Sequence, residues 1–149
     1  MGFKRIEILL AYDNSNGLLA PIVSNMLEML NVRGFNVDVL ELGDGAVPDV
    51  ELEDYSGLIL GCPVPGMGLR RHGPTQPVVD FLEVVEELDE VKVIVFSVYR
   101  LFPGDTLENL EIEVQERGGE LVASQEIWAL HPDAEDHHIP AECMVRIRS

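Results

Sequence analysis

Residues 6–32 read IEILLAYDNSNGLLAPIVSNMLEMLNV, and this stretch decides the fold. An apolar run from Ile6 to Ala11 gives way to a polar segment from Tyr12 to Gly17. Apolar residues then return with helical spacing at Leu19, Ile22, Met26, Leu27 and Leu30. The pattern predicts a strand, a tight polar loop and a helix. In an α/β protein the first such turn directs backbone N–H groups and the positive end of a helix dipole at the strand tip, so the loop is a candidate phosphate site.

Composition bounds the class of protein. The 149 residues fit one domain, and no apolar run approaches the ~18 residues of a membrane span. The N-terminus lacks the apolar region of a signal peptide, so we expect a cytoplasmic protein. The formal net charge of -17 argues against nucleic acid and membrane as partners and favours a basic protein partner, although it also suits a salt-rich cytoplasm. Cys62 and Cys143 are too few for a disulfide framework, and we expect reduced thiols.

Five strand candidates alternate with helix candidates. Several strands are almost continuous in Val, Ile and Leu, as strands buried on both faces of a parallel sheet should be. Gly43 to Asp54 lacks an amphipathic period and is expected to be a loop or a short helix. The alternation predicts an α/β protein with a doubly wound sheet, whose ligand crevice lies beyond the carboxyl ends of the strands. The predicted strands are Arg5 to Ala11, Asn36 to Leu42, Gly57 to Gly61, Val91 to Ser97 and Glu120 to Leu130.

Helix boundaries are marked by residue type as well as by period. Gly34 and Gly118 follow two predicted helices, where a left-handed residue is needed before the next strand. The segment Asp105 to Glu108 offers a capping box for the helix from Thr106 to Arg117. Another helix is expected to begin at Thr75, with Pro77 in its first turn.

Three predicted strand-tip loops should converge on the crevice: Tyr12 to Gly17, Cys62 to Gly73, and Val98 to Asp105. At these loops the chain resembles the flavodoxin-like proteins, through residues 9–17, 33–39, 55–63 and 95–99 in their order and spacing. The resemblance covers residues 4–130 and implies a three-layer sandwich around a five-stranded parallel sheet of order 2-1-3-4-5. It also implies FMN as a cofactor, bound by the three loops.

The resemblance assigns a role to residues of each loop. Leu18, Leu19 and Pro21 depart from the polar pattern of the phosphate loop, and Pro21 has no N–H to donate. The residues implied in flavin binding are Asn14, Ser15, Asn16 and Gly17 for the phosphate, with Leu18 next to them, Cys62, Pro63, Val64, Pro65 and Gly66 for one side of the ring, and Tyr99 for the other.

Two functions of different classes are compatible with this sequence. One is an FMN-binding electron-transfer protein or reductase component of the flavodoxin type, whose flavin carries the redox chemistry. The alternative is a flavodoxin-like domain without flavin that acts as a protein-binding or assembly module. We predict no catalytic residue, since the sequence places no base beside Cys62.

The sequence does not assign a single role to two further segments. Arg70 and Arg71 form a basic cluster that either faces the crevice or pairs with surface carboxylates. The tail, residues 131–149, is atypical of the family. Its histidines and carboxylates match no zinc motif, so we predict no metal site, and its alternating end could be an edge strand or an arm on a second copy in a homo-oligomer.

Overall fold

The computed structural model describes residues 6–15, 17–43, 50–65 and 73–129. Within these residues, five parallel strands form one sheet in the order β2-β1-β3-β4-β5. The predicted α/β class, parallel pairing and strand order are confirmed. The strands are β1 (Ile6–Asp13), β2 (Phe35–Leu42), β3 (Gly57–Pro63), β4 (Lys92–Tyr99) and β5 (Glu120–Trp128).

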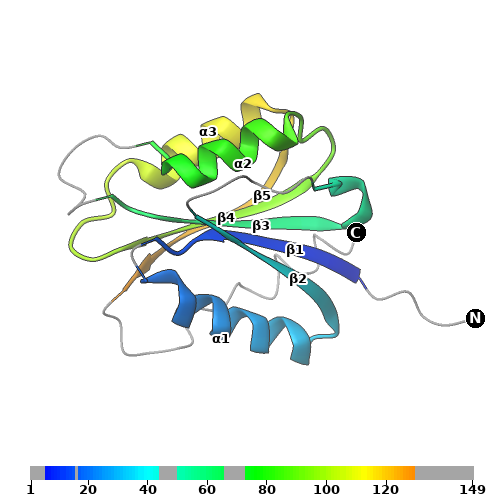
Figure 1. The fold of residues 1–149 in the computed structure, drawn as a ribbon, viewed down its shortest axis with the longest axis horizontal. Coiled ribbons are helices and arrows are strands. Elements are labelled where there is room, and N and C mark those ends of the chain that lie inside the picture. The colour runs from blue at the N-terminus through cyan, green and yellow to red at the C-terminus, as the bar shows by residue number, and fades with distance from the viewer. Residues whose placement is uncertain (1–5, 16, 44–49, 66–72, 130–149) are drawn as a thin grey trace, which may run out of the picture.

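Helices cover both faces of the sheet and make a three-layer sandwich (Figure 1). Helix α1 (Leu19–Val32) lies on one face, and helices α2 (Gln76–Val85) and α3 (Thr106–Glu116) lie together on the other. A short 3-10 helix, η1 (Leu52–Asp54), precedes β3 and matches the short helix allowed for that segment. No helix in the described ranges has the length and apolarity that crossing a bilayer requires.

Alternate residues of each strand feed two separate cores. On β1, Ile8 and Leu10 pack toward α1, whereas Leu9 and Ala11 pack toward α2 and α3. Strand β3 is buried at all seven positions, so its apolar run is continuous rather than alternating. The predicted inner face of α2 is confirmed, since Val78, Phe81 and Leu82 are buried and Val85 packs against them.

The carboxyl ends of three strands extend two residues further than the sequence predicted. Strand β1 reaches Asp13 and β3 reaches Pro63, while β4 reaches Tyr99 and pairs there with Trp128 of β5. Asp, Pro and Tyr are common at strand ends and in loops, so residue type alone predicts strand ends that lie before the observed ones. The first residues of each predicted loop therefore belong to the rigid sheet.

Helix ends agree with the sequence at the glycines and differ at the caps. Gly34 and Gly118 have φ values of 87° and 88°, the left-handed conformation predicted for them. The capping box at Asp105 does not form, because the Asp105 side chain makes no hydrogen bond to the helix start. Thr75 also makes no side-chain cap, since its hydroxyl is directed elsewhere.

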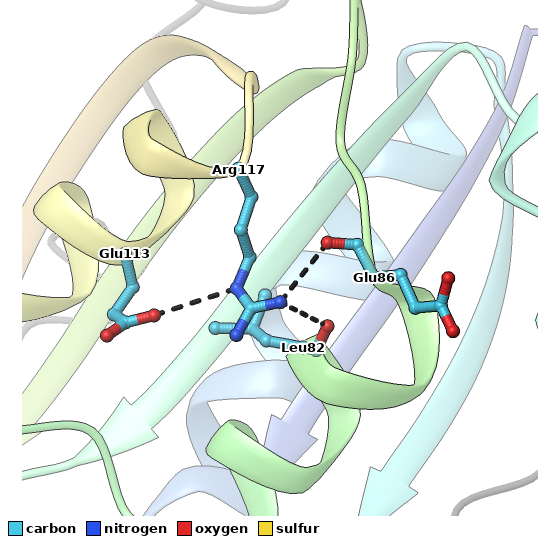
Figure 2. A network of polar contacts seen from close by, with 4 residues as sticks. All are labelled: Leu82, Glu86, Glu113 and Arg117. Carbon is cyan, nitrogen blue, oxygen red and sulfur yellow. Dashed lines mark hydrogen bonds and ion pairs between the residues drawn. The ribbon is translucent and has the colours of Figure 1, made fainter.

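Arg117 links α2 to α3 at their carboxyl ends (Figure 2). Its Nη1 donates to the backbone oxygen of Leu82 at 3.0 Å and to that of Glu86 at 3.1 Å, and its Nε lies 3.6 Å from Glu113. The Leu82 carbonyl already accepts the Glu86 N–H at 3.0 Å, so the guanidinium is a second donor there, and it also bonds the Glu86 carbonyl just beyond the helix end. This contact holds the two helices in register over one face of the sheet.

Gly61 makes room for the ring of Phe96, its register partner on β4. A Cβ atom built at Gly61 would overlap the ring of Phe96, which is itself buried. Small-to-large changes in a packed core force neighbouring side chains out of their rotamers. The absence of a side chain at this position therefore lets an aromatic ring fill the middle of the sheet.

We expect Gly61→Ala to lower the free energy of unfolding by about 1 to 3 kcal/mol, because the Phe96 ring must move. Gly43→Ala is the matched control, since no atom lies within 4 Å of a Cβ there. Urea unfolding followed by the fluorescence of Trp128, the one tryptophan of the chain, measures both variants. Equal midpoints for the two variants would show that the Phe96 contact does not limit this position.

Candidate functional site

A row of polar side chains crosses the sheet just inside its carboxyl edge. Cys62 of β3 pairs in register with Ser97 of β4, and Asp13 of β1 lies one step beyond the pair formed by Tyr12 and Gly61. All three members of the row, Asp13, Cys62 and Ser97, are fully buried. They continue the side of the sheet that packs on α2 and α3. Sequence reasoning placed Cys62 in this region but did not identify Asp13 or Ser97.

Thr75, directly before α2, joins two members of this row. Its hydroxyl donates to Asp13 Oδ2 at 2.5 Å, and its backbone N–H donates to Cys62 Sγ at 3.3 Å. The other carboxylate oxygen of Asp13 accepts the backbone N–H of Ser15 at 2.8 Å. A buried carboxylate is costly unless it is hydrogen-bonded. The Asp13 carboxylate therefore ties together the tip of β1, the loop after it and the start of α2.

Cys62 is a buried thiol. Burial raises the pKa of Cys62 to about 11, against the weaker lowering effect of the hydrogen bonds from Thr75. The thiolate is the nucleophilic form, so a thiol with this pKa is unreactive near neutral pH. The structure places the Cys62 side chain inside the core, where it packs against its neighbours, and its predicted place beside a flavin ring stays a prediction.

The loop after β1 uses its own backbone donors internally. Besides the Ser15 bond, the N–H of Gly17 donates to the Asn14 carbonyl and the N–H of Ala20 donates to Asn14 Oδ1, each at 3.0 Å. Asn14 thus caps the first turn of α1, where Leu18 offers no side-chain cap. Gly17 has a φ of 76°, as a tight turn at this position requires. The N–H groups of Ser15, Gly17 and Ala20 are therefore bonded to acceptors within the chain.

Among the described residues, two acidic groups stand beside this loop. The Asn14 amide Nδ2 donates to Glu41 Oε1 at 3.3 Å, at the end of β2. Asp13 is the buried carboxylate on the opposite side of the loop. No lysine or arginine occurs in its described part, residues 13–15 and 17–21. The charges described around the loop are therefore negative and unfavourable for an anion.

The tips of β4 and β5 carry an apolar surface. Tyr99 is half-buried, and Leu101, Phe102 and Trp128 are 55%, 52% and 41% exposed. The Trp128 indole N–H donates to the Arg100 carbonyl at 2.9 Å, so the indole lies against the segment that follows β4. Val64 is buried beside the same strand end, where its N–H donates to the Val98 carbonyl. Exposed aromatic groups gathered at a strand edge are typical of a binding surface.

Several predicted site residues lie outside the described ranges: Asn16, Gly66, Arg70, Arg71 and the tail from 131 to 149. Of the remaining candidates, Asn14, Ser15, Gly17 and Leu18 are brought together in the loop after β1. Pro63, Val64 and Pro65 lie at the end of β3, near Tyr99. Within the described residues, no group of three or more potential ligand side chains is placed to hold a metal ion.

A separate hollow of about 590 Å³ lies at the opposite end of the sheet. It is lined by residues around η1 and between α2 and β4, among them Leu52, Val84 and Glu87. None of the residues implied by the sequence resemblance lines it. The carboxyl edge, where those residues gather, is the candidate site.

Comparison with solved structures identifies the architecture. A two-electron reduced flavodoxin from Megasphaera elsdenii superimposes with a TM-score of 0.72 and 16% identity, covering 95% of this chain and 99% of that one. The chain has a flavodoxin-like fold. Flavodoxin 2 from Bacillus cereus gives a TM-score of 0.69 with 27% identity and 95% coverage of both chains. A mutant flavo di-iron protein from Thermotoga maritima gives 0.72 and 18%, with 96% of this chain matching 36% of that one. No protein-family model and no curated protein matches the sequence.

The described residues of this flavodoxin-like chain fit the two ends of FMN unequally. The apolar groups around Tyr99 and Trp128 suit a flat aromatic ring. In the described part of the loop after β1, Ser15, Gly17 and Ala20 direct their N–H groups at acceptors within the chain, so these three groups are not free for a phosphate.

We expect Thr75→Val to lower the free energy of unfolding by about 1 to 3 kcal/mol, because one oxygen of the buried Asp13 carboxylate loses its donor. Thr75→Ser is the matched control, since it keeps the hydroxyl and should cost less than about 1 kcal/mol. Urea unfolding measures both variants. If Thr75→Val and Thr75→Ser lower the free energy of unfolding equally, the hydroxyl does not contribute to stability.

The raised pKa of Cys62 predicts loss of stability in alkali. The thiol in the unfolded chain ionises above about 9, whereas the folded one resists ionisation up to about 11. Stability from the protonated thiol is fully present below pH 9 and is lost as pH rises from 9 to 11, by about 2 to 3 kcal/mol. Unfolding of wild type and Cys62→Ala at pH 7.5 and pH 10 measures this. The free energy of unfolding of wild type should exceed that of Cys62→Ala by less at pH 10 than at pH 7.5. An unchanged difference would contradict the burial of the Cys62 thiol.

Proposed function

We propose that this chain binds a flavin at the carboxyl edge of its sheet and acts as an electron-transfer protein. The observation that carries this proposal is the apolar surface at the tips of β4 and β5, formed by Tyr99, Leu101, Phe102 and Trp128. It lies at the edge where doubly wound sheets bind their ligands. The likeness to solved flavodoxins supports the same site.

The residues of this edge suit a flat, mostly apolar group. Tyr99 ends a strand and accepts the Ala129 N–H through its carbonyl, so its backbone is fixed. Trp128 is fixed through its bond to Arg100. Rigid aromatic groups lose little conformational entropy when a ring packs against them. A bound flavin would supply the redox chemistry, while the chain supplies orientation and exclusion of water.

The acidic charge supports a basic protein as the electron-transfer partner. With a net charge of -17, the protein generates a field that accelerates encounters with positively charged surfaces and slows those with acidic ones. A partner of this kind would dock faster at low ionic strength.

A second candidate is a flavodoxin-like domain that binds a protein without any flavin. The internal hydrogen bonds of the loop after β1 favour this alternative, because a loop satisfied by Asp13 and Asn14 needs no ligand to order it. The exposed residues Leu101 and Phe102 would then contact the protein partner.

Flavin titration separates the two candidates. We expect riboflavin or FMN fluorescence to be quenched at tens of micromolar or below, and Tyr99→Ala to weaken that affinity about tenfold by removing stacking and buried area. Ile112→Ala is the control, because Ile112 is also an exposed apolar residue, 44% accessible, but on α3. If neither flavin is quenched at 100 µM, the electron-transfer proposal is wrong and the flavin-free alternative stands.

A further inference from the structure

The hollow at the amino edge of the sheet has two walls with the same acidic pattern. One wall is the segment 51–53 around η1, where the buried Leu52 stands between two glutamates. The other is the segment 87–89 between α2 and β4, where the buried Leu88 stands between a glutamate and an aspartate. Both leucines pack into the core under α2 and α3, and their acidic neighbours are exposed. The acidic residues that line the hollow are Glu51, Glu53, Glu87 and Asp89.

Backbone hydrogen bonds fix both walls. In the first wall the Tyr55 N–H donates to the Leu52 carbonyl at 3.0 Å. In the second wall the Leu88 N–H donates to the carbonyl of Arg117 at 2.8 Å, and the Arg117 side chain holds the end of α2. A surface that is already ordered loses little conformational entropy when a partner binds to it. The hollow of about 590 Å³ is therefore a preformed feature of the fold.

The floor between the two walls is apolar. Val84 is 40% exposed there, and Val50, Val85 and Val91 are half-buried against the core. Sites for small ligands enclose most of the ligand, whereas here the acidic rim and part of the floor are exposed. An open apolar surface rimmed by charged residues is typical of docking to another protein.

The carboxylates around the hollow lack a positive partner. None of the four forms a hydrogen bond or an ion pair with another residue in the described part of the chain, and none of the described lining residues is basic. They are not placed to share one metal ion. The Asp89 carboxylate lies against Gly118, so the three glutamates are the ones that we assign to a ligand. Like charges around one hollow repel one another, and a cation between them relieves that repulsion.

Charge decides what can cover this surface. The net charge of -17 counts every basic residue of the chain, so a second copy of the protein approaches with the same sign. We propose that the hollow docks a basic segment of a partner protein, in which lysine or arginine residues flank an apolar residue. The apolar side chain covers the valine floor, and the cations lie between the two acidic walls.

This docking site is separate from the edge where a flavin would lie. Strand β3 has seven residues and spans about 23 Å between the two edges of the sheet. A partner held at the amino edge therefore leaves Tyr99 and Trp128 uncovered at the carboxyl edge. The inference goes beyond the proposed function, and it holds whether or not the chain binds a flavin.

Two amidated hexapeptides of equal charge test the site by the anisotropy of an attached dye, in 0.15 M NaCl. We expect Lys-Lys-Leu-Leu-Lys-Lys to bind with a Kd of about 100 µM or below, at least fivefold more tightly than Lys-Lys-Gly-Gly-Lys-Lys, because only the first covers the apolar floor. Equal affinity for the two peptides, or no binding of either at about 1 mM, would overturn the inference.

Paired charge variants locate the binding. The double substitution Glu53→Gln and Glu87→Gln removes one carboxylate from each wall and should weaken the leucine peptide about five- to tenfold. Glu108→Gln with Glu126→Gln is the matched control, since it gives the same net charge from exposed positions on α3 and β5 outside the hollow. The control should change the Kd less than about twofold. Equal weakening in both double variants would show a general effect of net charge and would overturn the site.

Val84→Arg places a cation on the floor of the hollow and should weaken the leucine peptide at least about tenfold. Ile112→Arg is the matched control, because it makes the same charge change at an apolar residue of α3 that is 44% exposed, and it should have less than about a twofold effect. Circular dichroism checks that both variants are folded. An unchanged Kd in Val84→Arg would overturn the inference.

Two further outcomes would assign the hollow to another occupant. If free arginine displaces the leucine peptide at equal concentration, the hollow is a small-molecule site and the docking inference is wrong. If wild type sediments as a dimer and Val84→Arg as a monomer, the occupant is a second copy of the chain, and the inference is again wrong. A wild-type monomer whose bound peptide resists an equal concentration of arginine supports the basic segment.

Discussion

The Asp13 carboxylate and its two donors are the interaction on which the candidate site depends. A fully buried carboxylate must be hydrogen-bonded on both oxygens to be tolerated, and here the two donors come from different segments. Ser15 belongs to the loop after β1, whereas Thr75 stands at the start of α2. The positions of both segments relative to the strand tip are therefore fixed by one side chain, whose removal would leave the loop and the helix start without their common anchor.

The fold of this chain does not depend on the residues of the loop after β1. The sheet order and the three layers follow from buried apolar strands and from helices on both faces, and neither depends on the loop residues. The loop is stable by itself because Asn14 and Asp13 replace an external acceptor. The opposite end of the edge is different, since Leu101, Phe102 and Trp128 leave apolar surface exposed. Of the described residues at this edge, those at the tips of β4 and β5 therefore offer the apolar surface that a ligand could cover.

Periodicity and residue type were enough to predict the architecture, because buried parallel strands are continuous in apolar residues and glycines such as Gly34 mark helix ends locally. The predicted carboxyl ends of three strands fall two residues before the observed ends. The last residues of each strand pair with a neighbouring strand, and no local sequence pattern reveals that pairing. The same limit hid the role of Thr75, whose partner Asp13 lies 62 positions away. One signal was present: Asp13 continues the alternation of Leu9 and Ala11, which places a charge on a buried face.

The bond between Thr75 and Asp13 also imposes an order on folding. Because it joins residues separated by 62 positions, the loop after β1 cannot reach its final geometry until β3 is paired and the start of α2 has docked. During synthesis, β1, α1 and β2 leave the ribosome before that partner exists. The edge that would receive a ligand is therefore completed late, and a nascent chain that stops before residue 75 contains the loop sequence without a finished site.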